Sequence, residues 1–217
     1  MSLARQAAIA ACLCTLACAA QAQAPHTHEH SFSDAEKWAH SFDDPERDKW
    51  QKPHEVIMAL ALKPGDLVAD IGSGTGYFSM RLANFVPRGR VYGVDLEPEM
   101  VRYLAARAQK AGAKNVTAIA GKADRPNLPR KVDVVLMVDV FHHIADRSQY
   151  FRNLKASLKP GARVAIIDFN QTSSMGPPVA ERVPVAKVKE ELAAAGYAVA
   201  AEHAFLPDQY YVVFTAR

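Results

Sequence analysis

The feature that most constrains this 217-residue chain is a glycine-rich turn, Asp70-Ile71-Gly72-Ser73-Gly74-Thr75-Gly76. The apolar stretch before the turn, Leu67 to Ile71, favours a short strand, and apolar side chains recur at helical spacing from Gly76 to Val86. Glycine permits a tight turn and a close approach of a ligand to the backbone, and the amino end of a helix favours a negatively charged group. This order of strand, glycine turn and helix predicts a nucleotide-like ligand.

Strand and helix patterns alternate along the chain on both sides of this turn. Further strands are expected at residues 91–94, 116–120, 132–138 and 163–168, and further helices from Pro53 and at residues 98–111, 148–158 and 185–195. The last two β-rich stretches, Tyr197 to Phe205 and Tyr210 to Thr215, are too close in sequence for a parallel crossover and must form an antiparallel hairpin. Five strand–helix units and a hairpin predict an α/β fold. It is a Rossmann-like three-layer sandwich with a mostly parallel seven-stranded sheet.

The first 24 residues have the three parts of a secretory signal peptide. Arg5 is the basic start, Ala7 to Ala20 is an apolar run, and Ala22-Gln23-Ala24 has the small-residue pattern of a cleavage site. The run is shorter than the roughly 20 residues that span a bilayer, so cleavage after Ala24 is favoured over a membrane span. We therefore expect export to the periplasm and no stable membrane span after cleavage.

Cysteine chemistry is not expected in the exported chain. The three cysteines all lie in the leader: Cys12, Cys14 and Cys18. Cleavage would remove them, and with them any disulfide or cysteine metal ligand.

Residues 25–52 are predicted to form a segment separate from the globular domain at 53–217. The segment begins with three histidines, His26, His28 and His30. Imidazoles could bind zinc, copper or nickel, but a loose terminus is the simpler interpretation, so we predict no metal site. Asp34 could start a short helix with Trp38 and Phe42 on one face. That helix could be a lid over a pocket or a cover for the core, and the sequence favours neither.

The charge of the chain gives no sign of a nucleic-acid partner. It has 26 Lys and Arg against 23 Asp and Glu, a net charge of +3, and the basic residues are scattered along the sequence. Nucleic-acid-binding proteins usually gather their basic residues on one face. We therefore expect no nucleic acid among the partners.

Two details separate the glycine turn from one that binds a dinucleotide. Its spacing is G-x-G-x-G, and Tyr77 stands where a dinucleotide fingerprint would place its third glycine. Asp70 ends the strand, and its carboxylate suits a ligand with an ammonium group better than a pyrophosphate. Asp95 ends the next strand, where it can accept hydrogen bonds from two ribose hydroxyls.

The segments Val-Ala-Asp-Ile-Gly-Ser-Gly-Thr-Gly-Tyr and Val-Tyr-Gly-Val-Asp-Leu-Glu-Pro-Glu-Met resemble the class I S-adenosylmethionine-dependent methyltransferases. The resemblance covers roughly residues 53 to 217 and includes the terminal hairpin. It implies S-adenosyl-L-methionine as the cofactor. The implied contacts to its methionine part and ribose come from Asp70, Gly72, Gly74, Gly76 and Asp95.

The resemblance is weaker at the adenine contact. The family often has an acidic residue in the loop after the third strand, and here Lys122 stands where aspartate is common. Asp124 is the candidate that replaces it. The stretches Asp-Ala-Glu-Lys-Trp and Trp-Gln-Lys-Pro are also similar to exported methyltransferases of undefined substrate.

Acceptor-side residues are expected where the fourth and fifth strands end, because ligands gather at the carboxyl edge of such sheets. The fourth strand leads into Asp139-Val140-Phe141-His142-His143, and in the family a similar aromatic residue or leucine followed by two histidines lines the methyl-transfer pocket. The resemblance implies His142 or His143 as a base, with simple packing as the alternative for each. Asp139 could orient the cofactor ammonium or the acceptor. Trp50 and Phe141 are expected to line the pocket. The end of the fifth strand adds further candidates for the acceptor side on position alone: Asp168, Phe169 and Asn170.

The sequence therefore predicts an enzyme that transfers a methyl group from S-adenosylmethionine to a small-molecule acceptor. The sulfonium is already activated, so the protein mainly aligns the acceptor and removes a proton. The alternative is an exported protein that binds S-adenosylmethionine or a metal but catalyses nothing. A nicotinamide oxidoreductase is disfavoured by the glycine spacing.

Overall fold

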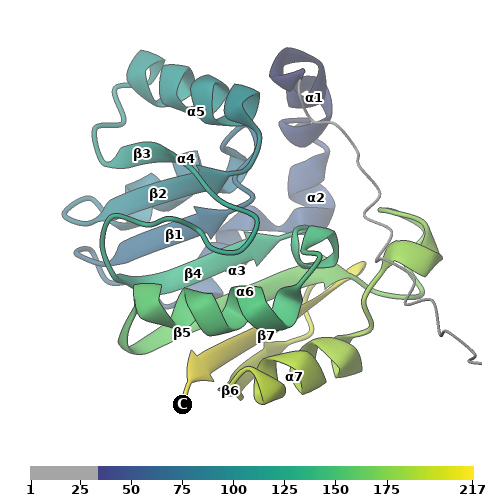
Figure 1. Cartoon of the computed structure of the whole chain (residues 1–217). Helices are drawn as coiled ribbons and strands as arrows, with labels where there is room; N and C mark the ends of the chain where they lie inside the picture. Colours follow the sequence, from purple (N-terminus) through teal and green to yellow (C-terminus); the bar gives the residue numbers. More distant parts are fainter. Residues whose placement is uncertain (1–33) are drawn as a thin grey trace, which may run out of the picture.

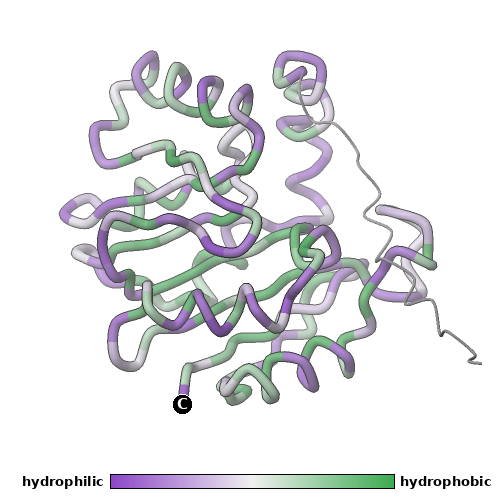
Figure 2. The backbone as a smooth tube through the Cα atoms, in the orientation of Figure 1, coloured by the Kyte–Doolittle hydropathy of each residue, from purple (hydrophilic) through white to green (hydrophobic). Residues whose placement is uncertain are grey.

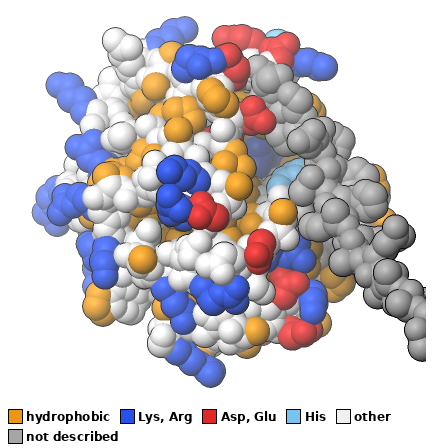
Figure 3. All heavy atoms as spheres, in the orientation of Figure 1, with side chains coloured by type: hydrophobic (Ala, Val, Ile, Leu, Met, Phe, Trp, Pro, Cys, Tyr) orange, Lys and Arg blue, Asp and Glu red, His pale blue; other side chains and the backbone are white. Residues whose placement is uncertain are grey.

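The computed structural model describes residues 34–217, which fold into three layers, a central sheet with helices on both of its faces (Figure 1). The predicted signal peptide, the three cysteines and the three histidines at positions 26, 28 and 30 lie outside the described residues. Within residues 34–217, no helix is both long enough and apolar enough to cross a membrane. Lys and Arg side chains are spread over the face shown in Figure 3, where acidic side chains lie among them.

The sheet has seven strands in the described part of the chain. They are β1 (Leu67–Ile71), β2 (Arg90–Asp95), β3 (Val116–Ala120), β4 (Val132–Val138), β5 (Leu158–Phe169), β6 (Tyr197–His203) and β7 (Gln209–Ala216). Their order is β3-β2-β1-β4-β5-β7-β6, with β1 to β5 parallel and β7 antiparallel to both β5 and β6. This confirms the predicted fold and terminal hairpin. The strand order reverses between β1 and β4, and ligands of such sheets bind in the crevice at that point.

In the described part of the chain, six of the seven α-helices lie where the sequence predicts them, and α2 was not predicted. They are α1 (Ala35–Phe42), α2 (Arg47–Gln51), α3 (Pro53–Ala59), α4 (Tyr77–Phe85), α5 (Pro98–Lys110), α6 (Arg147–Leu154) and α7 (Val185–Ala194). Short 3-10 helices are η1 (Phe141–His143), η2 (Lys155–Ser157) and η3 (Val179–Glu181). Asp34 caps α1 by accepting a 3.0 Å hydrogen bond from the Lys37 backbone N–H, as the sequence suggests. Trp38 and Phe42 share one face of α1, with ring centroids 5.4 Å apart.

Two connections differ from the sequence prediction. The β3–β4 connection, residues 121–131, contains no helix, so four strand–helix units precede the hairpin and not five. Pro126 and Pro129 explain the difference, because proline interrupts a helix. The predicted helix at 148–158 ends at Leu154, and β5 already begins at Leu158. A register shift between Val132 and Val134 accommodates the early start of β5.

The core consists of two apolar clusters, one on each face of the sheet. One joins α3, α4 and α5 to the sheet, and the other joins α6 and α7 to the opposite face. All five residues of β1 are buried, as are six of the seven in β4. Figure 2 shows the hydrophobic residues concentrated along these central strands. Strands buried on both faces hold the loops at their carboxyl ends in fixed positions.

Gly93 in β2 lets α4 and α5 approach the sheet closely. A Cβ atom at this position would lie 2.2 Å from Leu104 Cδ2 and 2.9 Å from Ser79 Oγ. Both neighbours are themselves buried, so neither can move away without disturbing the packing.

We predict that Gly93→Ala lowers the free energy of unfolding by about 1–3 kcal/mol, because the added methyl group overpacks this contact. Urea denaturation followed by circular dichroism measures the change. Gly65→Ala is the matched control, since a Cβ there has nothing within 4 Å. The control should change the free energy of unfolding by about 0.5 kcal/mol at most. Equal effects of the two substitutions would contradict this explanation.

Candidate functional site

The glycine turn closes the end of β1 and starts α4. Gly72, Gly74 and Gly76 have φ angles of +71°, +51° and +93°, a region that residues with a Cβ atom rarely adopt. The backbone N–H groups of Gly72 and Ser73 donate to the Val94 carbonyl at 2.8 and 3.0 Å, which ties the turn to β2. A Cβ at Gly72 would lie 2.1 Å from a Val140 methyl carbon. Backbone conformation and space therefore both require glycine in this turn.

Two hydroxyl groups of the turn are buried without a hydrogen-bond partner among the described residues. They are Ser73 Oγ and Thr75 Oγ1, and both residues are at least nine-tenths buried. A buried hydroxyl without a partner is unfavourable, and such groups are uncommon in folded proteins. Ser73 Oγ lies 3.2 Å from the position that a Cβ of Gly93 would take, so this hydroxyl points toward β2.

Asp95 lies at the carboxyl end of β2, beside the turn. Its Oδ2 accepts a 2.8 Å hydrogen bond from the Gly74 N–H, and its Oδ1 accepts one of 3.0 Å from the Glu97 N–H. Burial raises the pKa of Asp95, although the backbone N–H groups oppose the change. Each carboxylate oxygen keeps a second lone pair for a ligand hydroxyl. The geometry therefore suits the predicted contact to two ribose hydroxyls.

Asp124, the candidate for the adenine contact, is half exposed and forms a 2.7 Å ion pair with Arg125. The loop that carries it starts next to the site, because the Gly121 N–H donates to the Asp95 carbonyl at 2.8 Å. The role of Asp124 stays a prediction.

Asp70 lies beneath the turn and is 3% exposed. Ser79 Oγ, on α4, donates a 2.6 Å hydrogen bond to its Oδ2. Burial raises the pKa of Asp70 to about 6, even though the Ser79 hydrogen bond lowers it. A cationic ligand group nearby would favour the charged carboxylate.

The N-terminal helices contact the turn directly. The Phe42 ring lies 3.3 Å from the position that a Cβ of Gly74 would take. Asp43, just after α1, pairs at 2.7 Å with Arg107, whose Nη1 also donates to the Thr75 carbonyl at 3.0 Å. The segment predicted as a lid or a cover thus lies on the glycine turn.

Arg47 of α2 is a site residue that the sequence analysis missed. Its guanidinium lies 3.8 Å from Asp139 Oδ2 and 4.1 Å from the centroid of the Tyr77 ring. It is held by hydrogen bonds to Gln51 Oε1 at 3.2 and 3.3 Å and to the Phe42 carbonyl at 3.0 Å. Its side chain is only 14% exposed. No motif in the sequence marks this arginine, which stands among many other charged residues.

Asp139 follows β4 with a φ of +59°, a strained conformation for a residue with a side chain. Gln209 Nε2 donates to its Oδ1 at 2.5 Å, and Gln51 Nε2 donates to Gln209 Oε1 at the same distance. Burial and the negative charge of Asp168 raise the pKa of Asp139 to about 7, although Arg47 opposes them. The charged form of Asp139 is therefore disfavoured here, and a positive group of a ligand would favour it.

His142 and Asp168 form a close pair across the ends of β4 and β5. The ring Nδ1 lies 2.9 and 2.8 Å from the two carboxylate oxygens of Asp168, which is 1% exposed. The carboxylate also accepts from the backbone N–H groups of His142, at 3.3 Å, and Phe169, at 2.8 Å. Burial lowers the pKa of His142, but the hydrogen bond and charge of Asp168 outweigh it, so the pKa lies above its ordinary value. Nδ1 faces an acceptor, which leaves Nε2 to exchange protons.

The predicted pocket residues differ in their positions. The centroid of the Trp50 ring lies 5.8 Å from that of the Phe169 ring. The Arg47 guanidinium lies 5.9 Å from the centroid of the Trp50 ring. Phe141 is fully buried against Phe151, with ring centroids 5.5 Å apart. Phe141 therefore packs beneath the turn that carries His142, and its place in the acceptor pocket stays a prediction. The neighbouring residue His143 is exposed.

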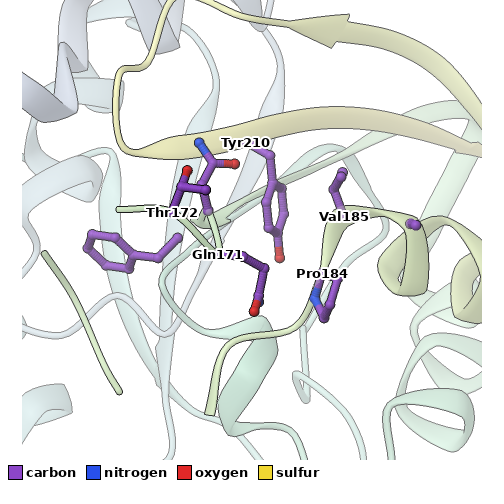
Figure 4. Close-up of a pocket in the computed structure, with 8 residues that line it drawn as sticks. Gln171, Thr172, Pro184, Val185 and Tyr210 are labelled. Atoms are coloured by element: carbon purple, nitrogen blue, oxygen red, sulfur yellow. The ribbon is translucent and has the colours of Figure 1, made fainter. Parts of the chain in front are cut away.

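A cavity of about 270 Å³ lies where β5 and β7 meet the amino end of α7 (Figure 4). Phe169 and Tyr210 form part of its wall. Tyr210 is the direct partner of Asp168 in the antiparallel β5–β7 register. The wall of the cavity therefore includes the direct strand partner of Asp168.

Comparisons with known proteins agree with this geometry. Residues 62–216 match the model of a family described as a methyltransferase domain. The chain is 31% identical to a SAM-dependent methyltransferase from Aquifex aeolicus of known structure, covering 83% of this chain and 97% of that one, with a TM-score of 0.78. Magnesium protoporphyrin IX methyltransferase from Synechocystis PCC 6803, solved with bound SAH, shares the fold, with a TM-score of 0.66 at 20% identity, over 86% and 96% of the two chains.

Curated relatives match over shorter segments. An arsenite methyltransferase from Halobacterium salinarum is 36% identical over 115 residues, which is 52% of this chain and 29% of that protein. A demethylmenaquinone methyltransferase from Listeria welshimeri is 29% identical over 130 residues, 59% of this chain and 54% of that protein. The chain thus matches about half, or less, of the length of these relatives.

The His142–Asp168 pair gives a prediction about proton binding. We expect Asp168→Asn to lower the pKa of His142, because the substitution removes the charge that raises it and leaves the burial that lowers it. NMR titration of the histidine rings measures this pKa, and His142→Gln identifies the resonance.

Asp139→Asn is the matched comparison, since Asp139 also raises the pKa of His142 but by less than Asp168 does. It should lower the pKa by a smaller amount. An unchanged pKa in Asp168→Asn would show that the pair does not control the histidine.

Proposed function

The chain belongs to the class I S-adenosylmethionine-dependent methyltransferases, and on this premise we propose that it transfers a methyl group from S-adenosylmethionine to a small-molecule acceptor. One observation carries the proposal. The glycine turn after β1 and the His142–Asp168 pair after β4 and β5 lie at the same edge of the sheet, on the two sides of its switch point. The cofactor turn and the proton-accepting group therefore lie where ligands of such sheets bind.

The residues at this edge fit the cofactor. Arg47 offers a positive charge to the carboxylate of its methionine part, and Asp139 offers a negative charge to the ammonium group. Asp70 adds a second carboxylate beneath the turn. Asp95 would hold the ribose hydroxyls. When bound, S-adenosylmethionine supplies a methyl group already activated by its sulfonium.

His142 is proposed as the group that takes a proton from the acceptor at Nε2. Asp168 holds the ring through Nδ1 and stabilises the charged imidazole, so it is a positioning residue. The backbone N–H groups that bind Asp168 fix the carboxylate in turn. Proton transfer requires neutral His142, so activity should rise as pH increases through its raised pKa.

The helices α1 and α2 are proposed to act as a lid. They place Phe42 on the glycine turn and Arg47 between Tyr77 and Asp139, so they cover the position where the cofactor binds. Asp43 and Arg107 form an ion pair in which the side chain of Asp43 is 22% exposed and that of Arg107 is 31% exposed. This pair is partly buried and Arg107 also donates to the Thr75 carbonyl, so the contact holds α1 against the turn in the closed arrangement.

A small acceptor is favoured by the size of the cavity next to Asp168, about 270 Å³. This volume is at the lower end of ligand pockets. The relatives named for arsenite and demethylmenaquinone methylation are consistent with a small-molecule acceptor.

Binding without turnover is the competing function. The buried His142–Asp168 pair favours turnover, because a protein that only senses the cofactor needs no oriented proton acceptor. Within residues 34–217, no group of three or more His, Cys, Asp or Glu could hold a metal ion. Release of S-adenosylhomocysteine in a screen of phenols, thiols and arsenite separates the two functions, since a sensor would release none.

Binding of S-adenosylhomocysteine, measured by isothermal titration calorimetry, tests the cofactor site. We expect the protein to bind it, and Asp95→Ala to weaken binding at least tenfold, because two charge-assisted hydrogen bonds are lost. Glu99→Ala is the control, since this carboxylate lies on α5 and is paired with Arg102. Absence of binding by the unmodified protein would overturn the proposed function.

We also propose that the protein is exported, on the basis of the leader at residues 1–24. The mature chain in a periplasmic fraction should begin at Pro25, which mass spectrometry of the intact protein would show. Ala24→Arg should block cleavage, because the cleavage site needs small residues. Recovery of the chain with its first 24 residues intact, in the cytosol only, would contradict export.

A further inference from the structure

The cavity at the β5–β7 edge has an apolar wall and one buried hydroxyl. Its apolar surface comes from Phe169, Pro184, Val185 and the ring of Tyr210, and the exposed residues Gln171 and Thr172 lie at its side (Figure 4). Its volume, about 270 Å³, suits a molecule of one or two rings. An apolar cavity with few polar groups is typical of a site for a small organic ligand.

The buried hydroxyl belongs to Tyr210, which is 7% exposed. Its oxygen is buried and has no hydrogen-bond partner among the described residues. Figure 4 shows the ring descending from β7 with its hydroxyl between Gln171 and Pro184. Burial, and then the charge of Asp168, raise the pKa of Tyr210, so the group stays a neutral donor. A ligand oxygen would give this hydroxyl the partner that the protein does not supply.

The amino end of α7 adds donors at the same cavity. Val185 and Ala186 are the first two residues of this ten-residue helix, and both line the cavity. The first N–H groups of a helix have no partner within the helix, and no side chain caps α7. Tyr210 and the helix end therefore both favour a ligand oxygen that accepts hydrogen bonds.

The wall between β5 and α7 is held by Arg182, which is 8% exposed. Its guanidinium donates to four backbone carbonyls of the preceding loop, those of Asn170, Ser173, Met175 and Pro177, at 2.7–2.8 Å. In the same loop Gly176 packs so closely on Phe169 that a Cβ would lie 2.5 Å from the ring. The cavity is therefore preorganised, which lowers the cost of binding.

The charges around Tyr210 disfavour an anion. No residue that lines the cavity in the described part of the chain is a lysine or arginine. The charges that act on Tyr210 are the carboxylates of Asp168, Asp139 and Glu191 and the guanidinium of Arg147. Arg147 already pairs with Glu191 at 2.5 Å. A neutral ligand oxygen avoids repulsion by the remaining carboxylates.

We propose, resting on the function above, that this cavity binds the methyl acceptor, and that the acceptor is an uncharged, flat, apolar molecule whose hydroxyl or carbonyl oxygen accepts a hydrogen bond from Tyr210. The cavity begins beside Asp168, so an acceptor held there lies next to the His142–Asp168 pair. Tyr210 is thus a binding residue that selects for a neutral oxygen.

Three probes that share the naphthalene ring system test the proposal. Their binding is measured with the full protein in the presence of S-adenosylhomocysteine. Equilibrium dialysis should show that 1-naphthol binds at least tenfold more tightly than naphthalene, which lacks the oxygen, and than 1-naphthoate, which is an anion. Tenfold corresponds to about 1.4 kcal/mol, a typical value for one hydrogen bond. Equal binding of naphthol and naphthalene, or tightest binding of naphthoate, would overturn the proposal.

Variants locate the binding. Tyr210→Phe should abolish the preference for naphthol and leave naphthalene binding unchanged, and it should fold normally because the hydroxyl has no partner to lose. Tyr103→Phe on α5 is the matched control and should keep the preference. Ala186→Phe should fill the cavity and weaken both ligands at least tenfold.

The result for S-adenosylhomocysteine separates this inference from the proposed function. If it binds to every variant while Tyr210→Phe keeps the naphthol preference, the acceptor site is elsewhere and the proposed function stands. If it fails to bind the unmodified protein, the proposed function itself fails.

Discussion

The left-handed backbone of the glycine turn is the constraint on which the rest of the site depends. Three glycines with positive φ bring the chain from β1 into α4, and the Val94 carbonyl holds the turn against β2. This geometry points the Gly74 N–H at Asp95 and leaves the turn open to contact by Phe42. A side chain on any of these glycines would strain the backbone, and one at Gly72 or Gly76 would also collide with a packed neighbour.

Around this turn the protein keeps several charges out of water. Asp70 and Asp168 are buried and Asp139 is half-buried within one region, with Arg47 and His142 as the opposing groups. Burying like charges is unfavourable, and the raised pKa values of Asp70 and Asp139 record that cost. The positive φ of Asp139 adds backbone strain in the same place. Such a cluster persists because the strands beneath it are buried on both faces and fix its position.

The sequence predicted the features that depend on neighbouring residues. The glycine turn, Asp95 and the cap at Asp34 are local patterns, and all seven strands follow from apolar runs. Features that depend on distant residues were not predictable. Gln51 and Gln209 are 158 positions apart and meet only in the folded protein. Arg47 carries no signal because one arginine in a charged segment resembles any other.

Other differences have equally specific causes. Phe141 stands beside two histidines in the sequence, and η1 places its ring against Phe151 in the core, a contact that the sequence does not indicate. The fifth strand was expected from Arg163, yet β5 begins at Leu158 and runs through Lys159-Pro160-Gly161. The roles of the site residues, Asp124 among them, follow from resemblance and stay predictions.

The contacts of α2 also show that the boundary of the fold differs from the boundary of the site. The family match begins at residue 62 and contains all seven strands, whereas Arg47, Trp50 and Gln51 precede it. A chain trimmed to the matched region would keep every strand and the glycine turn but would lose its guanidinium beside Asp139. The proposed site therefore includes residues outside the matched region, so a chain trimmed to residues 62–216 is a poor substitute for the full protein in binding measurements.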